Sequence, residues 1–226
     1  MVAEYIEARV RREWPDNAQV VAGSTPVISF GDATKARVAT LGLNPSRCEF
    51  NRNRGLAAWG STAQQVIDGC HQYFQRNPYR QWFDRLESVL TGFDASYYDG
   101  SACHLDLVQW ATDPTWARLA APLRTRLMND DVPFLIQQLQ ANDNIQVLLV
   151  NGRGALDQLR ARLPVRNFQE VATISGLSHQ PAVLSSGRLF SRIQVLGWTT
   201  NLQSSFGVRQ ALWTTELPHR LRSIQL

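Results

Sequence analysis

Apolar runs alternate with amphipathic stretches along this chain. A short, nearly continuous apolar run is typical of a strand buried on both faces of a sheet, whereas apolar residues at three- to four-residue spacing indicate a helix. A short strand and turn is predicted at Val27–Asp32. The pattern further predicts strands at Arg37–Leu43, Ser101–Trp110, Ile145–Val150, Phe168–Ile174 and Arg192–Trp198. Between them it predicts helices at Thr62–Tyr73, Tyr79–Leu90 and Asp131–Leu139, and a closing helix at Val208–Thr215. A further helix is predicted to follow the segment Asn151–Gly154 and to end at about Leu163.

This alternation favours one α/β domain over residues 1–226, with a central, mostly parallel sheet covered by helices on both faces. Phe168–Ile174 is expected at the sheet edge, and Pro133 in the first turn of its helix. Gly176–Gly187 contains Gly, Ser, His and Pro, so we predict a surface loop there that contacts a ligand.

Composition narrows the class of protein. Hydrophobic residues make up 44% of the chain, yet no apolar run reaches the roughly 20 residues that a membrane span needs. The first residues lack the apolar core of a signal peptide, and the 3 cysteines form no CxxC pair. We therefore expect a cytoplasmic protein with no membrane contact and no metal.

The charge is compatible with a nucleic-acid partner. The net charge is +4, and Lys35 is the only lysine, so nearly all basic residues are arginines. Arginine forms bidentate hydrogen bonds to phosphate and stacks on flat rings. A coding sequence rich in arginine codons explains the same bias equally well.

Polar or glycine-rich segments follow the predicted strands. Ligands of open α/β sheets gather at the carboxyl ends of the strands, so these segments are expected to share one cleft. They are Gly42–Ser46, His104–Leu107, Asn151–Gly154 and Thr199–Ser205.

Taken in order, these segments resemble motifs of the uracil-DNA glycosylase superfamily between roughly Arg37 and Leu217. Thr40–Ser46 is similar to the first motif, in which a strand delivers Gly-x-Asn-Pro. Phe74–Phe83 resembles the aromatic stretch of the family, and Ala102–Trp110 resembles its second strand motif. Val147–Leu156 resembles the strand–glycine–helix unit, and Thr200–Ser205 resembles the final loop.

The resemblance implies a role for each site residue. Asn44 would orient the attacking water, Asp106 would bind the base edge or stabilise the sugar, and Asn201 would donate to the leaving base. Phe50 would stack on the base, with Phe74 or Trp59 as alternatives. The phosphate-binding residues would be Ser46, Ser204 and Ser205. No cofactor is implied.

Two departures from the family pattern bear on the substrate. Asp106 stands where a base-reading Asn is expected, and the final loop lacks His and Pro. An ionised carboxylate only accepts hydrogen bonds, so it repels the carbonyl oxygens of uracil and suits the exocyclic amine of cytosine. A cytosine-type or modified-cytosine base is therefore expected rather than uracil.

The leading hypothesis is a monomeric, monofunctional DNA glycosylase that excises a damaged or modified pyrimidine, in genome repair or in defence against phage DNA. The first alternative is a non-catalytic nucleic-acid sensor on the same fold. The second is an unrelated α/β enzyme that acts on a nucleotide or another small phosphate-bearing molecule.

Overall fold

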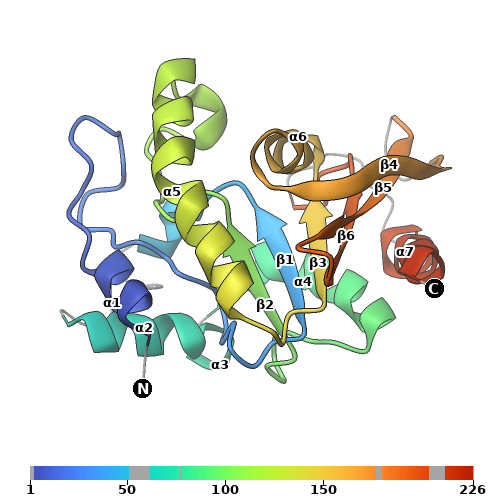
Figure 1. The fold of residues 1–226 in the computed structure, drawn as a ribbon, viewed down its shortest axis with the longest axis horizontal. Coiled ribbons are helices and arrows are strands. Elements are labelled where there is room, and N and C mark those ends of the chain that lie inside the picture. The colour runs from blue at the N-terminus through green and yellow to red at the C-terminus, as the bar shows by residue number, and fades with distance from the viewer. Residues whose placement is uncertain (1–2, 51–61, 77, 177–179, 204–211, 226) are drawn as a thin grey trace.

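The computed structural model describes residues 3–50, 62–76, 78–176, 180–203 and 212–225. Helices and strands alternate along most of the chain, as predicted (Figure 1). The strands are β1 (Val38–Gly42), β2 (Ala102–Asp106), β3 (Val147–Asn151), β4 (Val165–Ile174), β5 (Ala182–Leu189) and β6 (Ile193–Trp198). The α-helices are α1 (Glu4–Val10), α2 (Ala63–His71), α3 (Tyr73–Arg76), α4 (Arg80–Leu90), α5 (Ala121–Ala141), α6 (Arg153–Arg162) and α7 (Leu217–Gln225).

The described strands form a six-stranded sheet in the order β2-β1-β3-β6-β5-β4. β2, β1, β3 and β6 are parallel, whereas β5 is antiparallel to both of its neighbours, β6 and β4. The predicted α/β class and mostly parallel sheet are confirmed, and β4 lies at an edge, as expected. Gly42 is paired with Asp106, and Asn151 with Trp198, so the carboxyl ends of the parallel strands lie side by side.

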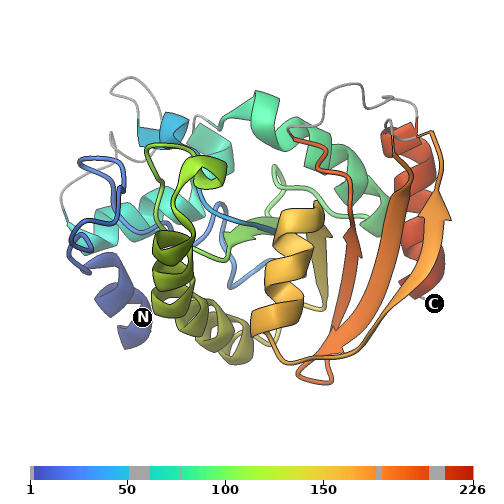
Figure 2. The same ribbon diagram turned by 90° about the horizontal axis from the view of Figure 1, so that it is seen from above.

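Alternate residues of the central strands face two hydrophobic cores. In β3, Val147 and Leu149 join one core, and Leu148 and Val150 join the other. The first core is completed by α2, α4 and α7, and the second by α5 and α6. Figure 2 shows α5 and α6 on one side of the sheet and α4 and α7 on the other, so the predicted two-sided cover is confirmed. None of the described helices has both the length and the apolar composition needed to cross a membrane.

The prediction of a loop at Gly176–Gly187 is wrong, because β5 begins at Ala182. This strand is hydrogen-bonded to β4 on one side and β6 on the other. Pairing on both sides outweighs the weak strand propensity of its serines and glycine. The predicted strand at Val27–Asp32 is also not formed. That segment makes only an isolated bridge between Phe30 and His104, at the outer edge of β2.

Two helix predictions need correction. The helix predicted at Asp131–Leu139 is α5, which starts at Ala121 and has Pro133 in its interior rather than in its first turn. The polar first half of α5 hides the apolar periodicity that a helix prediction uses. The closing helix, predicted at Val208–Thr215, begins at Leu217 after a π-helical turn. Residues 208–211 lie outside the described residues.

Candidate active site

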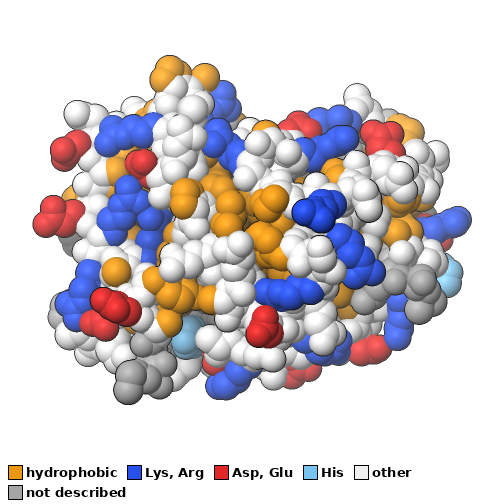
Figure 3. Space-filling view, viewed as in Figure 1, with side chains coloured by type: hydrophobic (Ala, Val, Ile, Leu, Met, Phe, Trp, Pro, Cys, Tyr) orange, Lys and Arg blue, Asp and Glu red, His pale blue; other side chains and the backbone are white. Residues whose placement is uncertain are grey.

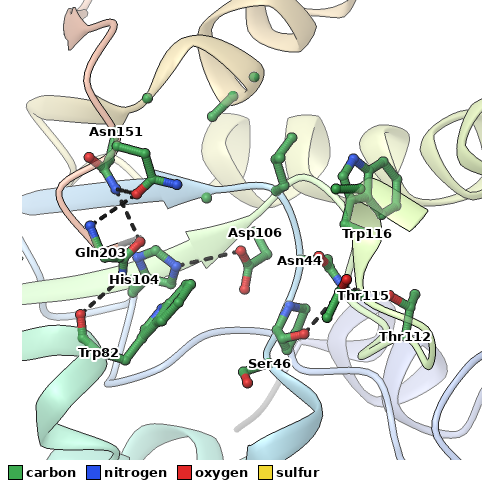
Figure 4. A pocket seen from close by; sticks show the side chains of 18 of the residues that line it. Asn44, Ser46, Trp82, His104, Asp106, Thr112, Thr115, Trp116, Asn151 and Gln203 are labelled. Atoms are coloured by element: carbon green, nitrogen blue, oxygen red, sulfur yellow. Dashed lines mark hydrogen bonds and ion pairs between the residues drawn. The ribbon is translucent and has the colours of Figure 1, made fainter. Parts of the chain in front are cut away.

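A cavity of about 460 Å³ lies where the carboxyl ends of β1, β2 and β3 meet the loop after β6 (Figure 4). All the strand-end segments singled out from the sequence contribute to its wall. The contributing residues are 42–48, His104 and Asp106, 151–155, and Asn201 with Gln203. Trp82 of α4 and residues 115–117 close the sides. This is the edge at which open α/β sheets bind ligands.

Asn44 follows β1 and is held by its amide nitrogen. Nδ2 lies 3.2 Å from the carbonyl oxygen of Pro45, from that of Trp110 and from Oγ1 of Thr112. Carbonyl oxygens only accept hydrogen bonds, so the donor end of the amide must face them. No donor among the described residues contacts Oδ1 of Asn44. The side chain therefore offers an acceptor oxygen at the cavity wall.

Asp106 ends β2 at the cavity and is only 6% exposed. Its Oδ1 lies 3.5 Å from Nε2 of His104, and no other described residue pairs with the carboxylate. The neighbouring strand end leaves room for it only because residue 42 is glycine. A Cβ on Gly42 would lie 2.6 Å from Oδ1 of Asp106 and 3.0 Å from Nε2 of His104.

The end of β2 is fixed from beneath by a buried polar cluster. Nε2 of Gln109 donates to the carbonyl oxygen of Asp106 at 2.9 Å, and the Gln109 side-chain oxygen accepts from Arg9 of α1 at 2.6 Å. Arg9 is ion-paired with Asp131 of α5, which also accepts from the backbone N–H of Gln109. Buried polar groups that are paired in this way hold one geometry, so the backbone at Asp106 is rigid.

Asn151, at the end of β3, organises the loop after β6. Its Oδ1 accepts from Nε1 of Trp198 at 3.0 Å and from the backbone N–H of Leu202 at 3.1 Å. Its Nδ2 donates to Oδ1 of Asn201 at 3.0 Å and to Oε1 of Gln203 at 3.1 Å. The sequence places Asn151 at a strand end but gives no sign that it positions Asn201.

Asn201 faces the cavity with its donor end available. Its Oδ1 also accepts from the backbone N–H of Gln203 at 3.0 Å, and no described acceptor contacts its Nδ2. Gly152 makes this position accessible. It has a φ of 91°, and a Cβ there would lie 3.0 Å from Cβ of Asn201. The cavity thus has an amide donor opposite the strand ends that carry the acceptors.

The other predicted site residues are distributed differently. Ser46 lines the cavity, and its Oγ accepts from the backbone N–H of Cys48 at 3.2 Å. Phe50 does not reach the cavity, because the 3₁₀ turn Arg47–Phe50 directs its apolar ring into the hydrophobic core. Phe74 is likewise a core residue. Ser204, Ser205 and Trp59 lie outside the described residues.

Among the described residues, Trp82 and Trp116 are the tryptophans that line the cavity, and the sequence analysis assigned neither of them to the site. In Figure 4 the side chains of Asp106 and Asn44 lie between the two rings. The apolar stripe of α4 predicts Trp82 as a core residue along with Phe83. Phe83 is indeed buried, whereas Trp82 is only partly buried and lies at the edge of the stripe.

Positive groups lie at the cavity rim. Arg153 is exposed at the start of α6 and has no ion pair with a described residue, and Arg47 pairs with Asp113 at 3.1 Å. The first backbone N–H groups of a helix also favour a bound anion. On the face that α5 and α6 cover, Lys and Arg side chains are spread out rather than gathered in one patch (Figure 3). The rim therefore combines cationic groups with a cavity.

No group of three His, Cys, Asp or Glu residues in the described ranges is arranged to hold a metal ion. Known protein-family models give no match to the chain, and curated proteins give no significant sequence match. The family resemblance therefore rests on the motif residues of the sequence alone.

Proposed function

We propose that the protein is a monofunctional DNA glycosylase that excises a damaged or modified pyrimidine and leaves an abasic site. One observation carries this proposal. Asn44, Asp106 and Asn201, named from separate sequence motifs, line a single cavity at the carboxyl edge of a mostly parallel sheet. Toward the cavity, Asn44 and Asp106 each offer a hydrogen-bond acceptor, and Asn201 offers a donor.

The polar groups favour a cytosine-type base. The Asp106 carboxylate accepts from an exocyclic amine, and the Asn201 amide donates to a ring nitrogen or carbonyl. Trp82 and Trp116 supply flat surfaces on which a flipped base stacks. The cavity volume of about 460 Å³ falls in the range of small-molecule sites, roughly 300–1,000 Å³, and leaves space for a substituent on the base.

In the proposed reaction, the oxygen of a water molecule adds to sugar C1′ while the C1′–N bond breaks. The bonding electron pair leaves with the base, which takes up the proton that the water loses. Asn44 accepts a hydrogen bond from the water and orients it, and Asn201 donates to the base as negative charge develops. Asp106 holds the base edge or, placed beside the sugar, stabilises the positive charge of the transition state.

A lyase step through an amine is not part of the proposal. Lys35, the only lysine, precedes β1 and therefore lies at the opposite end of that strand from the cavity. Its Nζ is paired with Asp32 at 3.0 Å. The reaction accordingly ends at the abasic site.

The DNA backbone is proposed to cross the rim at Ser46, Arg47 and Arg153, with Ser204 and Ser205 as further phosphate contacts. A monomer in the cytoplasm that acts in repair or against modified phage DNA completes the proposal. Flipping a base costs a few kcal/mol of stacking and pairing, which phosphate contacts of this kind offset.

The test uses duplexes that contain uracil, a thymine mismatch, a 5-substituted cytosine or a glucosylated cytosine, with abasic sites read out by alkaline strand cleavage. We expect release of a cytosine-type base by the wild-type protein, loss of release in Asn44→Ala, and wild-type release in Asn129→Ala. Asn129 is a matched control because it is exposed on α5, does not line the cavity, and accepts a hydrogen bond from Arg162 through its side-chain oxygen.

The other outcomes separate the alternatives. DNA binding without release of any base would support a non-catalytic sensor. If the protein neither binds DNA nor releases a base, an enzyme for a nucleotide or another phosphate-bearing molecule is favoured. The start of α6 and Arg153 would also suit the phosphate of such a molecule. Release of uracil alone would contradict the role given to Asp106.

A further inference from the structure

We propose that Tyr97, Thr40 and His104 form a directed hydrogen-bond chain that keeps His104 neutral, with its hydrogen on Nε2, and thereby holds Asp106 as a hydrogen-bond acceptor for the ligand. Thr40 and His104 face the same side of adjacent strands, β1 and β2, where they are paired in register. In this account His104 and Thr40 are positioning residues that act through Asp106. That Asp106 reads a base rests on the proposed function, whereas the state of the His104 ring does not.

The chain is continuous, and its part from Tyr97 to Thr40 is closed to solvent. The hydroxyl of Tyr97 lies 2.5 Å from Oγ1 of Thr40, and that oxygen lies 2.6 Å from Nδ1 of His104. Nε2 of His104 then lies 3.5 Å from Oδ1 of Asp106 (Figure 4). Tyr97 and Thr40 are 0% exposed and His104 is 2% exposed, so water does not substitute for the contacts of Thr40 with Tyr97 and with Nδ1 of His104.

The end of the chain at Tyr97 sets its direction. Burial raises the pKa of Tyr97 well above its usual value, so the phenol keeps its hydrogen. Thr40 is the only described residue within hydrogen-bond distance of that hydroxyl, so Tyr97 must donate to Thr40 or bury an unpaired hydrogen. Thr40 has a single hydrogen of its own, which is then directed at Nδ1 of His104.

The number of hydrogens that Tyr97 and Thr40 supply also disfavours the other protonation states of His104. A hydrogen on Nδ1 would require Thr40 to accept from His104 as well as from Tyr97. The Thr40 hydrogen would then be left with the carbonyl oxygen of Cys103, 3.5 Å away and at the outer limit of a hydrogen bond. With Nδ1 accepting instead, a neutral ring carries its hydrogen on Nε2, the atom that faces Asp106.

The ring has little freedom to escape this arrangement. The backbone of His104 exchanges two hydrogen bonds of 2.8 Å with Phe30. Its ring packs edge-on against Phe83, with centroids 5.3 Å apart. The titratable groups around the chain are Asp106 at one end and Glu87 and Cys103 near Tyr97.

The consequence concerns what Asp106 binds. An N–H facing Oδ1 stabilises the ionised carboxylate, and the second oxygen then accepts from the ligand. A carbonyl oxygen placed there would meet a carboxylate with no hydrogen to share. The chain is therefore a specificity device that favours a ligand with an amine donor and rejects one with a carbonyl at the same place.

The test is ¹⁵N NMR of the full chain with labelled histidine, recorded at about pH 8, where an ordinary histidine is neutral. We expect long-range proton–nitrogen correlations to show His104 with a hydrogen on Nε2 and an unprotonated Nδ1. A hydrogen on Nδ1, alone or together with one on Nε2, would overturn the proposal.

A variant tests the direction of the chain. In Tyr97→Phe the donor is gone, so Thr40 is free to accept from Nδ1, and a hydrogen on Nδ1 of His104 becomes compatible with its surroundings. At the same pH, the Nδ1 signal of His104 in this variant should therefore move toward that of a protonated nitrogen. Tyr73→Phe, which removes a buried hydroxyl paired with Glu49 elsewhere in the same aromatic cluster, should leave the His104 signals unchanged.

An unchanged Nδ1 signal in Tyr97→Phe would contradict the proposal, and if that variant does not fold, the wild-type spectrum decides alone. Thr40→Ser retains the hydroxyl and should retain the wild-type spectrum. The readout needs no substrate. If no base is released but the spectrum is as expected, the glycosylase proposal is rejected and this inference stands. If base is released but His104 carries a hydrogen on Nδ1, this inference is rejected and the glycosylase proposal stands.

Discussion

Asp106→Asn is the substitution that tests base recognition most sharply. It keeps the shape of the side chain but replaces an acceptor-only carboxylate with an amide that also donates. The side chain is 4% exposed, and its Oδ1 lies 3.5 Å from Nε2 of His104, a contact that an amide oxygen can also make. We therefore expect the free energy of unfolding to change by no more than about 1–2 kcal/mol.

The expected effect on activity is larger. A hydrogen bond to a charged group contributes about 1.5–3 kcal/mol, so losing the charge lowers kcat/KM for a cytosine-type base roughly 10- to 150-fold. The amide hydrogen also pairs with a carbonyl, so release of uracil should rise relative to release of the cytosine-type base. The ratio of the two rates, measured in single-turnover base release, isolates recognition from stability.

Asp157→Asn is the matched control, because Asp157 is an exposed carboxylate on α6 that does not line the cavity. It should leave both rates unchanged. If Asp106→Asn lowered the release of both bases equally, Asp106 would act on the sugar rather than on the base edge. If it changed neither rate, Asp106 would have no part in the reaction.

Three further predictions follow from the described contacts. Asn151→Leu leaves two buried N–H donors unpaired and should lower the free energy of unfolding by about 2–4 kcal/mol, as measured by urea denaturation; a loss below about 1 kcal/mol would contradict its role in the loop. Arg153→Gln should reduce the salt slope of DNA binding by about 0.9, and an unchanged slope would remove it from the phosphate path. In the native protein one thiol should react fast with a disulfide reagent, and three after unfolding. Burial raises the pKa of Cys70 to about 11 and also raises that of Cys103, whereas Cys48 is half-buried at the cavity; two or more fast native thiols would refute this.

The strands of the parallel sheet were predictable because each is a compact apolar run. β1, β3 and β6 differ from their predicted ranges by only a few end residues, and β2 stops at Asp106 instead of continuing to Trp110. β5 was not predictable, because its Ser-Ser-Gly composition gives no strand signal and its pairing with two neighbours exists only in three dimensions. Local composition decides an element when the side chains are apolar, and tertiary pairing decides it when they are not.

Part of the candidate site could likewise be predicted from the sequence, and part could not. The shared cavity of the segments that carry Asn44, Asp106 and Asn201 was predictable, because the carboxyl ends of parallel strands converge at one edge of the sheet. The choice of these three residues within the segments came from the family resemblance. Phe50 lies in the hydrophobic core instead, and the sequence does not determine which way the 3₁₀ turn Arg47–Phe50 points its ring. The position of Trp82 at the cavity was not predictable, because it lies at the border of the apolar face of α4. A residue at that border can face either a cavity or the core.

Mass spectrometry of the freed base shows whether the cavity hydrolyses a glycosidic bond. Wild-type protein and Asn44→Ala are compared on one duplex with a modified cytosine, at equal DNA occupancy. We expect free base in stoichiometric amount from the wild-type protein and at least about 100-fold less from Asn44→Ala, since positioned water supplies several kcal/mol of the barrier reduction. Equal release by both proteins, or no free base from either while DNA stays bound, would contradict the proposed hydrolysis.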